Sequence, residues 1–252
     1  MDFSYGDYIG LLRLLREQGY EIRGYHDYTD SERCVILRHD VDTSLDKALL
    51  MAELEAGEGV KSTYFVLLRT DFYNPASASA QQRIQKIAAL GHEIGLHFDE
   101  LAYPADVDVP TAIAKEAELL SGLCGFPIRS VSMHRPSKKT LESNYVLPGL
   151  VNSYGGEFFH GFKYLSDSRR RWREPVLDIV SDGSCNRLHI LTHPFWYGEE
   201  SLPMDRALDA FVRGAAEERY LQLKDNITDL SSVLPDSYTG AAGMKSESRG
   251  VL

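Results

Sequence analysis

Residues 34–44, CVILRHDVDTS, decide the fold of this chain. The run begins with apolar residues, typical of a buried strand, and leads directly into the polar sequence HDVDTS. Thr43 or Ser44 can then cap the helix that we expect in SLDKALLMAELEAGEG, residues 44–59. A buried strand followed at once by a helix is the repeating unit of parallel sheets, so the stretch predicts an α/β fold.

Strand and helix signals alternate on both sides of this stretch. Apolar residues at helical spacing predict a helix around residues 8–15, before Gly19. Further strands are expected at 62–68, 92–97, 127–135 and 188–193, further helices at 81–91, 110–125 and 204–223, and a looser region at 137–187. The alternation predicts a parallel sheet, open or closed, with its ligand site at the carboxyl ends of the strands.

Length and composition favour one catalytic domain. The chain has 252 residues, of which 43% are hydrophobic, enough for one sizeable core. We expect this domain over residues 1–230 and a poorly ordered tail, rich in Ser and Gly, over 231–252. A net charge of −10 argues against nucleic acid or an anionic membrane surface as partner. The basic cluster in 169–173 is interpreted as an ordinary solvated face.

The cysteines and the N-terminus favour a cytoplasmic protein. Cys34, Cys124 and Cys185 are odd in number and lack CxxC spacing, which argues against a disulfide framework. The first twenty residues read as an amphipathic helix rather than a signal peptide, and no apolar run is long enough for membrane insertion.

Polar groups with catalytic or ligating chemistry stand at the ends of four expected strands. They are Asp40 and Asp42, His97, the pair His134 and Arg135, and His193. Because alternate residues of an extended chain face the same side, the two aspartates should point together. One carboxylate can ligate a divalent metal, and the other can take a proton from the metal-bound water. A D-x-D pair that only caps the next helix is the simpler alternative.

The histidines suit two different tasks. Imidazole nitrogen is a favoured ligand of zinc, iron, cobalt and nickel, so His97 is a candidate metal ligand, whereas His92 should face the other way. His193, within LTHPFW, has a near-neutral ordinary pKa that suits a general acid for a departing amine. A structural histidine at a strand end is the alternative for each.

Five motifs follow one another within residues 38–194: RHDVD, GHEIGLH, SMHRPS, DSRRRW and ILTHP. Their order resembles the polysaccharide deacetylase family, also called the NodB-homology family or family 4 carbohydrate esterases, and GHEIGLH is the most specific piece. The resemblance implies a distorted (β/α) barrel and metal-dependent removal of acyl groups from N-acylated sugars.

The resemblance also implies individual roles. It assigns Asp40 as catalytic base, Asp42 and His97 as metal ligands, His193 as general acid, Arg135 as the arginine that orients the base, and Asp167 as the acidic residue that supports the machinery. The RHDVD motif, in place of a paired Asp-Asp, indicates a divergent branch.

The chain departs from the family at Leu101, where typical members carry the second metal histidine. We expect His134 to replace it, because it stands at the carboxyl end of the next strand along the chain. His134 and Arg135 should face opposite ways in a regular strand, so a bend at Pro136 is needed if both are to reach the site. The alternatives are His39, Asp99, Glu100 or water.

The leading hypothesis is hydrolysis of an N-acyl group, acetyl or formyl, from a free or carrier-linked amino-sugar intermediate of surface-glycan biosynthesis. The expected cofactor is zinc, with cobalt, nickel or iron as alternatives. Other interpretations are hydrolysis of another amide, imide or ureide, or an inactive carbohydrate-binding domain. A metal phosphohydrolase with a His-Asp pair is disfavoured, because such proteins are all-helical. Six aromatic residues could stack on a sugar, although such clusters more often fill a core: Tyr154, Phe158, Phe159, Trp172, Phe195 and Trp196.

Overall fold

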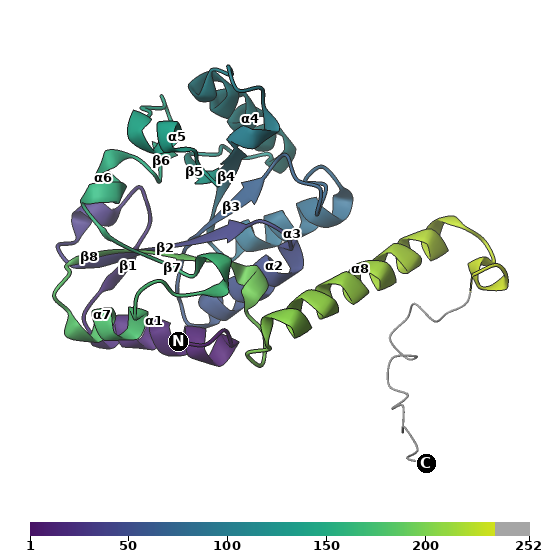
Figure 1. Cartoon of the computed structure of the whole chain (residues 1–252), viewed down its shortest axis with the longest axis horizontal. Helices are drawn as coiled ribbons and strands as arrows, with labels where there is room; N and C mark the ends of the chain where they lie inside the picture. The colour runs from purple at the N-terminus through teal and green to yellow at the C-terminus, as the bar shows by residue number, and fades with distance from the viewer. Residues whose placement is uncertain (235–252) are drawn as a thin grey trace, which may run out of the picture. The chain divides into compact units, whose positions relative to one another are not determined.

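A computed structural model describes residues 1–234 (Figure 1). The chain divides into two compact units, Met1–Ser201 and Leu202–Leu252. In its described part, the second unit contains helix α8 (Met204–Asn226) and the short 3-10 helix η5 (Leu230–Ser232). The expected tail, 231–252, falls almost entirely outside the described residues. Across residues 1–234, no helix is both long and apolar enough to cross a membrane.

The first unit holds the remaining elements. In chain order they are α1 (Tyr5–Glu17), β1 (Glu21–Arg23), η1 (Tyr28–Asp30), β2 (Cys34–Val41), α2 (Leu45–Gly57), β3 (Thr63–Leu67), α3 (Ala78–Ala89), β4 (Glu93–Asp99), η2 (Glu100–Ala102), α4 (Val109–Cys124), β5 (Ser130–His134), α5 (Lys138–Ser143), β6 (Val151–Asn152), α6 (Gly156–His160), β7 (Lys163–Ser166), η3 (Ser168–Arg170), α7 (Val176–Asp182), β8 (Arg187–Thr192) and η4 (Pro194–Trp196).

All strands of the first unit join one parallel sheet in the order β6-β5-β4-β3-β2-β8-β7. Strand β1 pairs with residues 34–36 of β2, and β3 pairs with residues 38–41 of the same strand. Within the described chain the edge strands β6 and β7 do not pair with each other, so the barrel stays open there. The α/β fold with a distorted, incompletely closed barrel is thus confirmed, and its strand ends gather the candidate residues at one edge.

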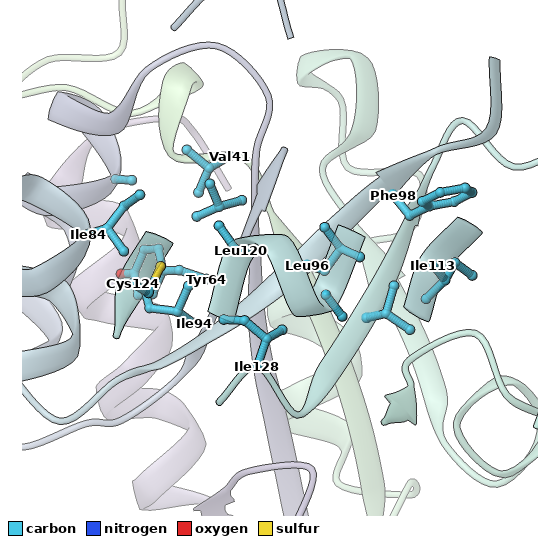
Figure 2. Close-up of a cluster of buried hydrophobic side chains, with 14 of the residues drawn as sticks. Val41, Tyr64, Ile84, Ile94, Leu96, Phe98, Ile113, Leu120, Cys124 and Ile128 are labelled. Atoms are coloured by element: carbon cyan, nitrogen blue, oxygen red, sulfur yellow. The ribbon is translucent and has the colours of Figure 1, made fainter. Parts of the chain in front are cut away.

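Alternation along the strands separates an outer face, covered by helices, from an inner face that carries the polar groups. On the outer face, Ile94 and Leu96 of β4 belong to the same buried cluster as Ile84 of α3 and Leu120 of α4 (Figure 2). Full burial of each such side chain contributes about 1.5–3 kcal/mol. This packing keeps the strands rigid and leaves the inner residues of β2 and β4 turned toward the site.

The structure differs from the expected elements in two places that bear on the site. Strand β2 continues through Val41, so Asp40 lies within the strand and Asp42 just beyond it, while Ser44 caps α2 by accepting from Lys47 N. The looser region 137–187 contains the strands β6 and β7, the helices α5, α6 and α7, and the 3-10 helix η3. Strand β7 was not expected, because its four residues, KYLS, contain no continuous apolar run. It lies at the edge of the sheet, beside β8.

A buried carboxylate ties α2 to the outer face of the sheet. Glu55 is fully buried and accepts hydrogen bonds from the hydroxyls of Tyr8 (2.6 Å), Ser62 (2.6 Å) and Tyr64 (2.7 Å). His39 Nε2 lies 2.9 Å from the same carboxylate. Since His39 immediately precedes Asp40 on β2, this cluster anchors the strand directly behind the candidate site.

Replacing Glu55 by glutamine is expected to destabilise the fold. Burial raises the pKa of Glu55, but His39 and its hydrogen bond, with His92 and Ser62, outweigh burial and lower that pKa to about 2. A carboxyl whose pKa is lower in the folded chain than in the unfolded chain stabilises the fold when the pH is above its unfolded-state pKa, about 4.3. This stabilisation is lost as the pH falls toward the pKa of the folded state. We expect the variant to lose about 3–5 kcal/mol of unfolding free energy at neutral pH.

Urea unfolding at neutral pH and at about pH 5 and about pH 3 measures this effect. The unfolding free energy of the wild type should fall more steeply between the two acidic conditions than that of the variant, which lacks the titrating group. Equal stability of the two proteins at neutral pH would show that the Glu55 cluster contributes little.

Candidate metal centre and active site

Three side chains from three strands converge at the carboxyl ends of the parallel sheet. Asp42 follows β2, His97 lies in β4, and His134 ends β5. His97 Nε2 and His134 Nδ1 lie 3.2 and 3.4 Å from Asp42 Oδ1, and the two nitrogens are 3.2 Å apart. The three atoms therefore form a nearly equilateral triangle.

The dimensions of this triangle fit a divalent cation. A tetrahedral ion with bonds of about 2.0–2.1 Å separates its ligand atoms by roughly 3.3 Å. Asp42 Oδ1 is buried and makes no hydrogen bond within residues 1–234. His97 Nδ1 lies 3.3 Å from the carbonyl oxygen of Ser132, a contact that fixes the ring with Nε2 toward the triangle. The arrangement offers three protein ligands, the number that catalytic zinc sites use.

The Asp42 carboxyl is held in its ionised form by the same neighbours. Burial raises its pKa, but contacts with His134 and His97 outweigh burial and hold the pKa well below its usual range. An ionised carboxylate beside two imidazoles is a suitable donor set for zinc and similar metals.

A turn at Arg135 gives His134 its position. Arg135 has φ 47°, in the left-handed region that residues other than glycine rarely adopt. The chain therefore turns at Arg135 rather than at Pro136. His134 stays toward the triangle, while the Arg135 guanidinium turns away and donates to Asp99 Oδ2 at 3.0 Å. The structure thus does not bring Arg135 to Asp40, which differs from the role that the family resemblance implies.

The alternatives for the third ligand are turned to other partners. Asp99 pairs with Arg135, His39 contacts Glu55, and Glu100 accepts hydrogen bonds at the start of α5. Leu101, at the position of the missing family histidine, lies on η2 and is 65% exposed. Among the residues considered from the sequence, His134 alone joins Asp42 and His97 in the triangle.

Asp40 lies beside the triangle and is buried. Its Oδ2 is 3.6 Å from His97 Nε2 and accepts a hydrogen bond of 2.8 Å from the guanidinium of Arg38. Its Oδ1 is buried and accepts no hydrogen bond from the described part of the chain. Burial raises the pKa of Asp40, but Arg38 and then His97 outweigh it, so the pKa lies below the ordinary value. The carboxylate is therefore ionised at neutral pH and can accept a proton.

Arg38 is the site residue that the sequence analysis missed. It stands two positions before Asp40 on β2, so both side chains face the barrel interior. A charged residue at the end of the apolar run CVILR was the available signal, because a buried charge needs a partner on the same face.

His193 and Asp167 form a hydrogen-bonded pair near Oδ2 of Asp42. Asp167, directly after β7, is fully buried; its Oδ1 lies 2.6 Å from His193 Nδ1, and its Oδ2 accepts from His193 N at 3.0 Å. His193 Nε2 lies 3.8 Å from Asp42 Oδ2. Burial lowers the pKa of His193, but Asp167 outweighs burial, with help from Asp40 and Asp42, and raises it to about 9. The contact with Asp167 therefore favours the protonated imidazole, whose Nε2 lies on the side of Asp42.

The aromatic residues near the expected mouth have mixed surroundings. Phe158 belongs to a buried inner cluster, and Trp172 and Trp196 pack against the core around α1. Phe159 is 46% exposed. The ring of Tyr154 contacts the site, with its centroid 4.9 Å from the Arg38 guanidinium carbon. Phe158, Trp172 and Trp196 thus have a core role, and the six residues form no continuous stacking wall.

Comparison with known proteins finds similarity at the level of structure. No family model and no curated protein matches the chain. Similar solved structures include the Xyl-CE4 domain of a multidomain xylanase from the hindgut metagenome of Trinervitermes trinervoides, at 14% identity and a TM-score of 0.45, over 75% of this chain and 85% of that one. The chitin deacetylase of Colletotrichum lindemuthianum matches at 16% identity and a TM-score of 0.44, over 71% and 81% of the two chains.

A CE4 family pseudoenzyme from Bacillus anthracis is also similar, at 15% identity and a TM-score of 0.42, over 75% of this chain and 62% of that one. The similar structures thus include members of the carbohydrate esterase family whose motifs this sequence resembles.

Proposed function

We propose that this chain is a metal-dependent hydrolase that removes an N-acyl group, acetyl or formyl, from an amino sugar, as a divergent member of the polysaccharide deacetylase family. The observation that carries the proposal is the arrangement around Asp42. An ionised carboxylate, Asp40, and a protonated imidazole, His193, both adjoin the triangle formed with His97 and His134. This is the equipment that amide hydrolysis needs, because a base must activate water and an acid must protonate the departing amine.

The residues divide the reaction between them. Asp40 accepts a proton from the attacking water, whose oxygen forms a bond to the acyl carbon. His193 then donates its Nε2 proton to the amine nitrogen as the carbon–nitrogen bond breaks, releasing the free amine and a carboxylic acid. Asp167 holds the His193 ring in place and stabilises its charged form.

Asp42, His97 and His134 would hold the metal, and two imidazole nitrogens with one carboxylate oxygen suit zinc, with cobalt, nickel or iron as substitutes. When bound there, the cation would polarise the acyl carbonyl and make a water molecule more acidic.

The proposed setting is the cytoplasm, with a free or carrier-linked amino-sugar intermediate of surface-glycan biosynthesis as substrate. Cys34, Cys124 and Cys185 are all unpaired, which suits a reducing compartment. Fractionation of cells that express the native protein tests this part, and recovery in an exported or membrane fraction would contradict it.

Release of acetate or formate from a panel of N-acyl amino sugars, free, nucleotide-linked and polymeric, tests the reaction. The protein is stripped of metal and reloaded with zinc, cobalt or nickel before each assay. Metal-dependent release supports the proposal. Turnover of cyclic imides or ureides alone would assign the site to another amide, and tight sugar binding without turnover in every metal form would make the chain a binding domain.

His193→Ala separates turnover from binding. We expect kcat to fall by about 10²–10⁴-fold with a much smaller change in KM, because a general acid acts chiefly as the leaving group departs. Steady-state kinetics with metal analysis measures both effects, and metal content should remain unchanged. Equal losses in kcat and substrate binding, together with a lowered melting temperature, would identify His193 as a structural residue instead.

A further inference from the structure

A guanidinium lies in the interior of the barrel, directly beneath the candidate base. Arg38 is fully buried, and besides Asp40 it donates to Ser153 Oγ at 2.9 Å. The rings of Tyr154 and Phe65 flank it, with centroids 4.9 and 5.5 Å from the guanidinium carbon. The side chain is therefore held by a carboxylate, a hydroxyl and two aromatic faces, and has little freedom to move.

Polar residues in the barrel interior surround the side chain of Arg38. Ser153 is buried beside Arg38, and the hydroxyl of Tyr25, also buried, lies 2.7 Å from His189 Nε2. Burial, and then the charge of Arg38, lower the pKa of His189, so this imidazole is neutral. Asp40 is thus the charged partner of Arg38.

Stability alone is a weak reason for such a pair. A buried ion pair can often be replaced by apolar residues of similar volume without loss of stability, because the desolvation of both charges offsets their attraction. What the pair provides is orientation. The hydrogen bond from Arg38 to Oδ2 of Asp40, the oxygen that lies 3.6 Å from His97 Nε2, fixes the rotation of the carboxylate beside the triangle, and the buried Oδ1 accepts no hydrogen bond among the described residues.

We propose that Arg38 is the positioning residue for Asp40 and takes the role that the family resemblance assigns to Arg135. The inference rests on the proposed hydrolase function. Arg135 turns instead to Asp99 and is 65% exposed, so its guanidinium is bound away from the base. In this chain the arginine and the base come from the same face of one strand, two residues apart.

Three variants of the zinc-loaded protein test the proposal: Arg38→Met, Arg38→Lys and Arg135→Met. We expect Arg38→Met to lower kcat on the order of 10²-fold with KM changed by less than about 3-fold, because a misplaced base costs about that much. Arg38→Lys keeps the positive charge but lacks the planar guanidinium that contacts both Asp40 and Ser153, so it should recover part of the lost kcat. Arg135→Met should lose at most a few-fold. Arg129→Met, in an exposed loop at the opposite end of the strands, is the matched control that should behave as wild type.

A double variant distinguishes positioning from a general effect on the fold. If Arg38 acts through Asp40, then Arg38→Met should cost little more in a protein that already carries Asp40→Asn. Zinc affinity, measured by calorimetry, should be the same in all variants. A crystal structure of Arg38→Lys should show the Asp40 carboxylate rotated and the Asp42, His97 and His134 triangle unchanged.

The outcomes separate this inference from the proposed function. Native kcat in folded Arg38→Lys and Arg38→Met, or a full additional loss in the double variant, would overturn the role of Arg38 while leaving the hydrolase intact. An unmoved Asp40 carboxylate in the crystal would also overturn it, without any assay. A wild-type protein that hydrolyses no N-acyl amino sugar would instead refute the function on which the inference rests.

Discussion

Asp40→Asn is expected to lower kcat by about 10²–10⁴-fold while zinc still binds with unchanged stoichiometry. Asparagine preserves the size of the side chain but cannot accept the proton from water. Asp40 lies beside the triangle, with its Oδ2 3.6 Å from His97 Nε2. It is not one of the three candidate metal ligands. Metal analysis after dialysis, together with kcat on the substrate identified above, measures the two properties separately.

Asp42→Asn is the matched comparison, because it makes the same chemical change two residues along the chain. It removes the carboxylate charge from the triangle and is expected to lose zinc and activity together. Near-native turnover of Asp40→Asn would show that the base is wrongly assigned. Loss of zinc from Asp40→Asn would instead place that residue among the ligands.

His134→Ala is expected to weaken zinc binding by well over about 10²-fold, because changes to residues that only support a ligand already cost about 10–100-fold. The triangle of 3.2–3.4 Å loses one corner, and Asp42 with His97 alone cannot provide three protein ligands. Calorimetry with zinc, and the absorption spectrum of the cobalt form, report on the site without any need for a substrate.

His26→Ala is the control for this experiment, since His26 is exposed and contacts Glu93 near the amino end of β4. It should bind zinc as the wild type does. Undiminished stoichiometry and affinity in His134→Ala would remove His134 from the site and leave water to complete it. Circular dichroism must show both variants to be folded, so that a loss of metal is not a loss of structure.

The sequence alone was sufficient for the architecture and for listing the polar residues at the strand ends. Apolar runs such as CVILR alternate with amphipathic helices, and this local pattern determines a parallel α/β sheet because each element must bury its own apolar face. Parallel strands end at one edge of the sheet, so residues at strand ends, such as Asp42, His97 and His193, could be grouped from the sequence.

Only the tertiary structure decided which side chains meet within that edge. The left-handed turn at Arg135 separates it from His134 and sends its guanidinium to Asp99, which leaves Arg38 as the partner of Asp40. Strand β7 brings Asp167 to His193, across 26 residues of sequence. These outcomes depend on one backbone angle and on the pairing of distant strands. Neither can be predicted from the local hydrophobic periodicity, because periodicity indicates which face of an element is buried and not which residues pack against that face.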